Sequence, residues 1–228
     1  MTRTNEWGQP VGDDLGGWRP PDAPPHIVLA GRVTTLRPID PDVHAVELFP
    51  AYADAPESLW TYLPYGPFTD AGELAATLAH LDALPDWQVY AIDVGDRLLG
   101  FLCYLRIDPG GGVIEIGGIT FSPALQRTRA ATESIHLLMA HAFELGYRRL
   151  EWKCDDLNAP SMRAAERLGF TFDGTFRQAT HYKGRNRDTA WFSILDHEWP
   201  ELAAGFDAWL DDDNFDADGG QRTPLRLR

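Results

Sequence analysis

A strand, a helix and a second strand in close succession constrain this chain more than any other stretch. Residues 113–121 are typical of a buried strand, and a loop rich in hydrogen-bond donors follows at 122–131. In the helix that comes next, apolar side chains recur at helical spacing on one face: Ile135, Leu138, Met139, Ala142 and Phe143. Gly146 supplies a helix stop, and residues 150–154 alternate as a strand. Such a succession forms a right-handed parallel unit, which we expect at the centre of a sheet.

Periodicity predicts further elements on both sides of this unit. Further helices are expected at 43–49, 70–84, 158–168 and 198–210, and further strands at 33–36, 88–93, 98–106, 170–183 and 189–195. Tight turns join 88–93, 98–106 and 113–121, so these strands are antiparallel neighbours. The order predicts an α+β fold, a three-layer α/β/α sandwich around a mixed, mostly antiparallel sheet.

We expect three parts in the chain. Residues 1–31 hold five of the 17 prolines and form an N-terminal arm, extended on the domain surface. Residues 32–196 form the domain, and residues 197–228 form a C-terminal helix followed by an acidic tail. The acidic run at 211–218 reads as solvated.

Composition limits the kinds of partner. The formal net charge of −14 argues against a nucleic-acid surface, because phosphate backbones are bound by excess Lys and Arg. No apolar run approaches membrane-spanning length, so no membrane association is expected. Cys103 and Cys154 lie in strand-like runs without a metal-ligand companion at short spacing. They read as buried free thiols of a cytoplasmic protein, and no metal site is expected.

The loop from Gln126 to Ala131 lies between a strand end and a helix start. There the free N–H groups of the first helical turn attract anions. We therefore expect a phosphate-bearing ligand at this loop. The alternative is an ordinary solvated basic loop.

Two stretches resemble the GNAT superfamily of acyl-CoA-dependent N-acyltransferases. Asn158-Ala-Pro-Ser161 with Gly169-Phe170 is similar to the Asn…Ser…Gly-Phe helix of that superfamily. The loop aligns with Gln/Arg-x-x-Gly-x-Gly/Ala, where Arg129 replaces the first glycine and Ala131 fills the second small position. The resemblance covers roughly residues 32–196 and is closest to the branch of ribosomal-protein N-terminal (alanine/serine) acetyltransferases.

The resemblance implies that acetyl-CoA donates an acetyl group to a small-molecule amine or a peptide N-terminus. It implies a strand splay near residues 117–120, where the pantetheine arm pairs with backbone groups of Ile119 and Phe121. A glycine at position 129 would let a pyrophosphate approach the backbone closely. Arg129 blocks that approach, but its guanidinium can bind phosphate through two hydrogen bonds. The implied cofactor-binding residues are Ile119, Thr120, Phe121, Gln126, Arg127, Thr128, Arg129, Ala130, Ala131, Thr132, Asn158 and Ser161.

Asn158 serves equally well as a helix N-cap, and Ser161 as a residue of the first helical turn. Either role, or both together, fits the sequence.

Glu115 is the candidate general base, because it shares a strand face with Val113, Gly117 and Ile119. The alternative is that this face is solvated at the start of the strand. Where many superfamily members carry a tyrosine acid, this chain has Ala165, so the acid is left open between other groups such as Tyr182 and His181.

Aromatic residues near 60–68 are the candidate acceptor wall: Trp60, Tyr62 and Tyr65, with Trp87 beside them. The alternative is a satellite core under a loop. Ala165 and the two tails also leave room for a non-catalytic CoA-binding or interaction protein of the same fold. A homodimer is plausible from the resemblance.

Overall fold

The computed structural model describes residues 3–227, and its main sheet has eight strands in the order β3-β4-β5-β6-β7-β8-β10-β9. The strands are β3 (Leu29–Ala30), β4 (Thr35–Pro38), β5 (Gln88–Asp93), β6 (Leu98–Asp108), β7 (Val113–Phe121), β8 (Arg149–Asp155), β9 (Thr171–Tyr182) and β10 (Arg185–Leu195). β7 and β8 pair in parallel, and the other neighbouring strands pair antiparallel. The expected mixed, mostly antiparallel sheet is confirmed.

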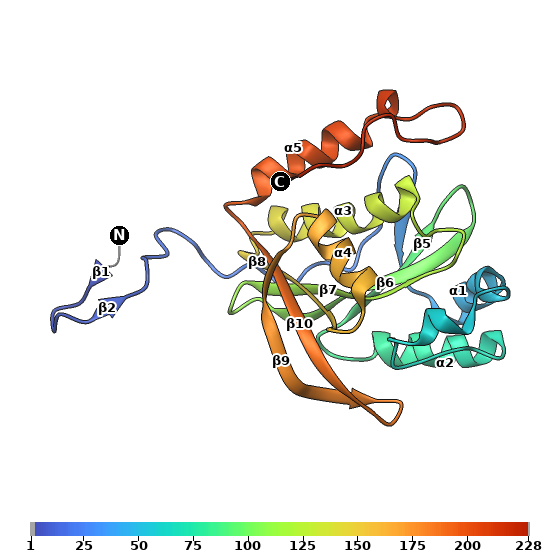
Figure 1. Cartoon of the computed structure of the whole chain (residues 1–228), viewed down its shortest axis with the longest axis horizontal. Helices are drawn as coiled ribbons and strands as arrows, with labels where there is room; N and C mark the ends of the chain where they lie inside the picture. The colour runs from blue at the N-terminus through green and yellow to red at the C-terminus, as the bar shows by residue number, and fades with distance from the viewer. Residues whose placement is uncertain (1–2, 228) are drawn as a thin grey trace.

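Helices cover both faces of the sheet, which confirms the three-layer architecture (Figure 1). α1 (Pro41–Leu48) and α2 (Ala71–Asp82) lie on one face, and α3 (Arg129–Glu144), α4 (Ala159–Arg167) and α5 (Trp199–Leu210) lie on the other. An apolar core lies on each face of the sheet, between its strands and the helices that cover it. Within residues 3–227, none of the helices has the length and apolar character that a membrane span requires.

The helices begin where the sequence supplies capping side chains. Asp70 accepts a hydrogen bond from the Glu73 N–H, and Thr128 accepts one from the Ala131 N–H. Such caps satisfy donors that lack a partner inside the helix. The start of α3 is therefore fixed by Thr128, and this places the preceding loop directly after β7.

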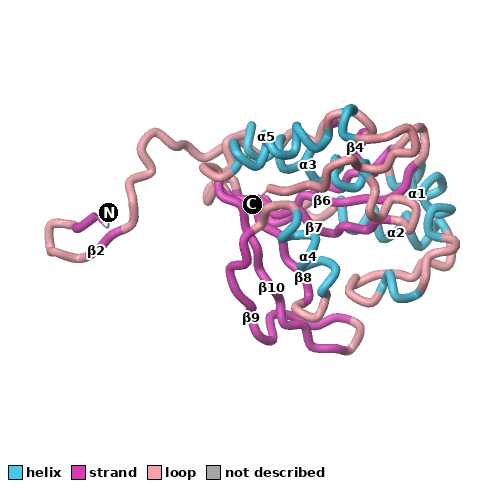
Figure 2. The backbone as a smooth tube through the Cα atoms, turned by 45° about the horizontal axis from the view of Figure 1, so that its top comes forward, coloured by secondary structure: helices cyan, strands magenta, loops and turns pink. Residues whose placement is uncertain are grey.

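The sheet splays at its parallel pair. Only residues 113–115 of β7 pair with β8, at residues 149–151, whereas β8 continues to Asp155 alongside β10. Figure 2 shows β8, β9 and β10 running away from the direction of β6 and β7. The second half of β7 has lost its neighbour on the β8 side.

A bulge accompanies the splay. Cys103 of β6 pairs with Gly117, but Phe101 pairs with Thr120, so β7 carries one extra residue. Gly118 has φ +58, and a β-carbon on it would lie 2.8 Å from Cys103 Sγ. Only glycine fits this position without displacement of the neighbouring strand.

Segments on the far side of the expected boundaries at 31/32 and 196/197 also belong to the main sheet and its core. β3 belongs to the main sheet, and α5 contributes Leu202 and Phe206 to the main core. The arm lies along the domain from Trp18, whose Nε1 donates to the Gly146 carbonyl at 3.2 Å. Before that it forms a hairpin of β1 (Arg3–Thr4) and β2 (Pro10–Val11) that projects from the body (Figure 1).

His136 is expected to make the packing of α5 on α3 sensitive to pH. Its ring stacks on Phe206 with centroids 4.8 Å apart, and burial lowers the His136 pKa although Asp207, Glu133 and Glu144 oppose this. Because the unfolded chain binds the proton more tightly, the free energy of unfolding should fall as pH drops below the ordinary histidine value of about 6.5. Urea denaturation at pH 7.5 and 5.5 measures this change.

His136→Gln removes the titrating group and should flatten that dependence. His141, whose pKa burial also lowers, accounts for part of the remaining slope. An unchanged slope in His136→Gln would show that His136 does not link α5 packing to pH.

Candidate active site

The second half of β7 presents backbone groups that have no strand partner on one side. Ser122 donates its N–H to Leu99 of β6 at 3.0 Å, and Thr120 pairs with Phe101 of the same strand. Alternate residues direct their backbone groups to opposite sides of a strand. Ile119 and Phe121 therefore direct theirs to the side from which β8 has diverged.

Thr120, expected among the cofactor-binding residues, is turned towards the opposite side. It is buried, its carbonyl accepts a hydrogen bond from the Tyr52 hydroxyl at 2.7 Å, and its Oγ1 lies 3.0 Å from the Tyr65 hydroxyl. Its role in the structure is to hold the bulged strand against the aromatic loop. Its side chain is not offered at the open edge.

The loop between β7 and α3 forms a tight turn at the helix start. Arg127 has φ +62, a left-handed conformation that is unusual outside glycine, and its side chain is exposed. Thr128 Oγ1 donates to the Leu125 carbonyl at 2.7 Å and accepts from the Ala131 N–H at 3.1 Å. Gln126 donates to the Phe121 carbonyl at 3.2 Å.

Ala130, Ala131 and Thr132, the remaining cofactor-binding candidates of this loop, lie in the first turn of α3 and are buried. Small side chains let this turn pack against the sheet. The N–H groups of Arg129 and Ala130 precede the first intrahelical bonds and stay available to an anion.

Arg129 does not offer the free phosphate-binding fork that the sequence suggested. Its Nη2 lies 2.6 Å from Asp212 Oδ1 and donates to the Leu210 carbonyl, and its guanidinium stacks 4.3 Å from the Phe215 ring centre. Residues of the C-terminal segment therefore bind the guanidinium of Arg129. Asp212 of the acidic run is exposed as expected, with 76% of its side chain accessible, but its ion pair with Arg129 holds it in place.

Asn158 and Ser161 hold the start of α4 beside the end of β8. The Asn158 side chain accepts from the Ser161 N–H at 3.2 Å, and Ser161 Oγ accepts from Trp152 Nε1 at 3.0 Å. The structural roles left open by the sequence are therefore present. Ala165 is fully buried, and its methyl group offers no proton donor.

Tyr182 is the phenol next to the open end of β8. Its hydroxyl donates to Asp155 Oδ2 at 2.6 Å, and burial together with this carboxylate raises the Tyr182 pKa to about 12. The phenol therefore keeps its proton at neutral pH. His181, the other group left open, is exposed.

Glu115 is buried, and its surroundings are charged rather than apolar. Only 3% of the residue is exposed, which excludes the solvated face considered as the alternative. Its Oε2 lies 2.6 Å from Arg106 Nη1 and 2.9 Å from Lys153 Nζ. The expectation that Glu115 lies among apolar side chains is wrong, because Arg106 of β6 and Lys153 of β8 both bind its Oε2.

Of the expected acceptor wall, Trp60 is core. It is 3% exposed and packs edge-to-face against Tyr52 and Phe68. Tyr62 instead reaches across the splay, where its hydroxyl donates to the Leu157 carbonyl at 3.0 Å. Trp87 lies beside the bulge, because a β-carbon on Gly118 would come 3.6 Å from its ring.

The tip of the β9–β10 hairpin is hydrogen-bonded to the aromatic loop, residues 60–68. Lys183 Nζ donates to the carbonyls of Trp60, Tyr65 and Gly66 at 2.9, 3.2 and 2.9 Å. Arg185 donates to the Thr61 carbonyl at 2.6 Å. The sequence did not single out these two cations for this role, because their acceptors are main-chain carbonyls more than 115 residues away.

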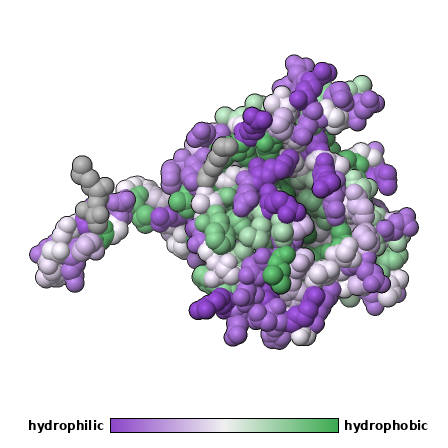
Figure 3. Space-filling model, viewed as in Figure 1, coloured by the Kyte–Doolittle hydropathy of each residue, from purple (hydrophilic) through white to green (hydrophobic). Residues whose placement is uncertain are grey.

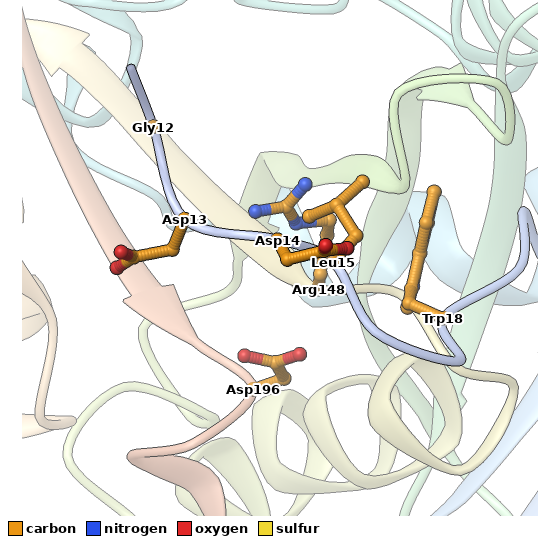
Figure 4. Close-up of a pocket in the computed structure, with 7 residues that line it drawn as sticks. All are labelled: Gly12, Asp13, Asp14, Leu15, Trp18, Arg148 and Asp196. Atoms are coloured by element: carbon orange, nitrogen blue, oxygen red, sulfur yellow. The ribbon is translucent and has the colours of Figure 1, made fainter. Parts of the chain in front are cut away.

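A separate pocket (Figure 4) includes Arg148, which precedes β8 at the end away from the splay. Its lining residues come from the N-terminal arm and the ends of β8 and β10: Gly12, Asp13, Asp14, Leu15, Trp18, Arg148 and Asp196. It includes none of the residues predicted for the site. Figure 3 shows hydrophobic residues grouped on the face turned to the viewer, with hydrophilic residues around and between them.

Comparison with known proteins matches the geometry. Residues 34–171 match the family model described as the acetyltransferase (GNAT) domain. A GCN5-related N-acetyltransferase from Brucella melitensis is 42% identical, with a TM-score of 0.89 over 92% of this chain and 97% of that one. A probable GNAT-family acetyltransferase from Chromobacterium violaceum ATCC 12472 is 46% identical, with a TM-score of 0.80 over 84% and 98%.

A more distant structure has the same fold with coenzyme A bound. RimL, a ribosomal L7/L12 α-N-protein acetyltransferase in complex with coenzyme A, is 21% identical with a TM-score of 0.60, over 74% of this chain and 97% of that one. At this identity the likeness shows the fold alone. The family match and the two closer structures decide the assignment: the chain belongs to the GNAT family of N-acetyltransferases, enzymes that use acetyl-CoA as the acetyl donor.

Proposed function

We propose that this enzyme acetylates a primary amine, on a small molecule or a peptide N-terminus, by direct attack on acetyl-CoA bound at the splay. The observation that carries the proposal is the side of β7 at Ile119 and Phe121 that has no neighbouring strand, next to the N-terminal turn of α3. The pantetheine arm would add to this edge as a strand does. The diphosphate would bind at the loop 126–132, held by the first-turn N–H groups of α3 and by the exposed Arg127.

Glu115 is proposed as the base that takes a proton from the amine, directly or through water. A backbone N–H near Ile119 is proposed as the donor to the thioester oxygen. Asn158 and Ser161 are proposed to contact the pantetheine while they cap α4. No covalent intermediate is needed, and burial raises the pKa of the Cys103 and Cys154 thiols, which makes both poor nucleophiles.

The acceptor is proposed to enter between the aromatic loop and the β9–β10 hairpin, beside Tyr62, Tyr65 and Trp87. A peptide N-terminus is the first acceptor to test, because the RimL relative acts on one. We further propose a cytoplasmic enzyme, which fits two buried free thiols, and a homodimer, which fits the long exposed edge strand β9.

The test is incubation with acetyl-CoA and a panel of amines and Ala- or Ser-initiated peptides, following free thiol. Turnover above hydrolysis with at least one acceptor is expected. Binding of coenzyme A without turnover on any acceptor would favour a non-catalytic CoA-binding protein. Absence of binding would contradict both.

Lys183→Met should loosen the acceptor wall without affecting the cofactor. The substitution keeps the length of the side chain but removes three donated hydrogen bonds to the loop 60–66. We expect KM for the acceptor to rise about fivefold, which corresponds to a loss of about 1 kcal/mol in the free energy of acceptor binding. Initial rates with acceptor and acetyl-CoA varied in turn separate the two constants. An equal rise in KM for acetyl-CoA would show that this hairpin does not define the acceptor side.

A further inference from the structure

Lys153 is a buried cation at the apex of the splay. Glu115 of β7 and Glu151 of β8 form the last parallel pair before the two strands diverge. Lys153 follows on the same face of β8, and its Nζ lies 2.9 Å from Glu115 Oε2 and 2.7 Å from Glu151 Oε2. Its ammonium also lies 3.6 Å from the centre of the Trp191 ring, and its side chain is 3% exposed.

The charges around this apex balance only when Lys153 is counted. Arg106 reaches Glu115 from β6, and Arg149 links Glu151 to Asp173 of β9. Three acidic groups thus face three basic ones. Arg106 and Arg149 are more exposed than Lys153, with side chains 56% and 28% accessible. Lys153 is the cation that separates the two buried carboxylates, and removing one partner of such a cluster leaves uncompensated charge.

The contacts are also directional. Arg106 and Lys153 both bind Oε2 of Glu115. Oε1 lies towards Gly117, the residue before the bulge, where a β-carbon would come within 3.3 Å of it. One oxygen of the carboxylate is therefore held, while the other faces the part of β7 at which the thioester is proposed to bind.

We propose that Lys153 is a positioning residue for acetyl transfer, holding Glu115 by one oxygen so that the other receives the proton of the acceptor amine. The inference rests on the proposed role of Glu115 as the base. The reaction balances within that role: the neutral amine nitrogen bonds to the acetyl carbon, the carbon–sulfur bond breaks, coenzyme A leaves as the thiolate, and the amine proton passes to Glu115.

Lys153→Met removes the charge and keeps the side-chain length. Because misplacement of a catalytic group by about 1 Å costs on the order of 100-fold, we expect kcat to fall between about 10- and 100-fold, with KM for acetyl-CoA within twofold of the wild type. Glu115 and Glu151 would then face each other without a cation between them and would share a proton. The acid limb of the pH–rate profile should therefore move to higher pH.

Three further variants separate positioning from mere stability. Lys153→Met/Glu151→Gln removes the repelling carboxylate and should return the acid limb towards the wild-type pH. Lys153→Arg retains the charge and should rescue part of kcat. Arg149→Met disturbs the same cluster without touching Glu115, so it should lower the free energy of unfolding and leave the acid limb in place.

The outcomes distinguish this inference from the function on which it rests. If Glu115→Gln loses activity but Lys153→Met keeps its acid limb and kcat, the positioning role is overturned and the base remains. If Glu115→Gln turns over like the wild type, the assignment of the base itself fails. Should Lys153→Met not fold, the single variant Glu151→Gln decides. Lys153 would then pair with Glu115 alone, and the acid limb of the pH–rate profile should move to lower pH. An acid limb at the wild-type pH would overturn the inference.

Discussion

Glu115→Gln is expected to lower kcat by about 10²- to 10⁴-fold, the range usual for loss of a positioned proton-transfer group. The amide keeps the shape of the side chain but cannot accept the proton of the attacking amine. KM for acetyl-CoA should change little, because the proposed cofactor contacts lie at 119–132 and at the start of α4. Steady-state kinetics with the best acceptor of the panel measures both constants.

Stability provides the control for this variant, because Glu115 also pairs with the buried Lys153. Urea denaturation should show a folded protein with a smaller free energy of unfolding than the wild type. A folded Glu115→Gln enzyme with wild-type kcat across the pH range would remove Glu115 from the mechanism.

Arg127→Glu is expected to weaken coenzyme A binding about 10- to 100-fold. Arg127 is the exposed cation of the loop, whereas Arg129 is held by Asp212 and the Leu210 carbonyl. Two unit charges about 4 Å apart interact by roughly 1 kcal/mol in water and about 4 kcal/mol near a protein surface, so reversal beside a diphosphate is costly. Isothermal titration with coenzyme A gives the Kd.

Arg177→Glu is the matched control, since Arg177 is also an exposed arginine and lies on the edge strand β9. It changes the net charge by the same amount and should leave the Kd within about twofold. Equal weakening in both variants would indicate a general effect of net charge, which is large because the chain already carries −14. A wild-type Kd for Arg127→Glu would contradict diphosphate binding at this loop.

Local sequence patterns predicted the elements that form the site. The strand 113–121 has the bounds of β7, the alternation at 88–93 gave β5, and Asn158 caps α4 as its side chain suggested. Gly117 and Gly118 lie at the bulge, which is one of the two roles that adjacent glycines allow in a strand, the other being close approach to a ligand. These features depend on neighbours within a few residues, and such neighbours are visible in a sequence.

What the sequence could not show depends on contacts between distant segments. Arg129 read as a phosphate ligand because its partners at 210–215 lie about 80 residues away, in a run that looked solvated. Glu115 read as a carboxylate among apolar residues because the register that brings Lys153 beside it is set by the pairing of β7 with β8. The alternation of the strand 150–154 does place Glu151 and Lys153 on one face, and this was the available sign in the sequence of a charged cluster beside β7.

A crystal structure with coenzyme A bound tests the central claim most directly. The account predicts the diphosphate on the N–H groups of the loop 126–132, the pantetheine alongside Ile119 and Phe121, and the sulfur between β7 and β8 within reach of a water or amine bound to Glu115. A cofactor bound elsewhere, with the edge of β7 beyond Gly117 empty, would contradict it.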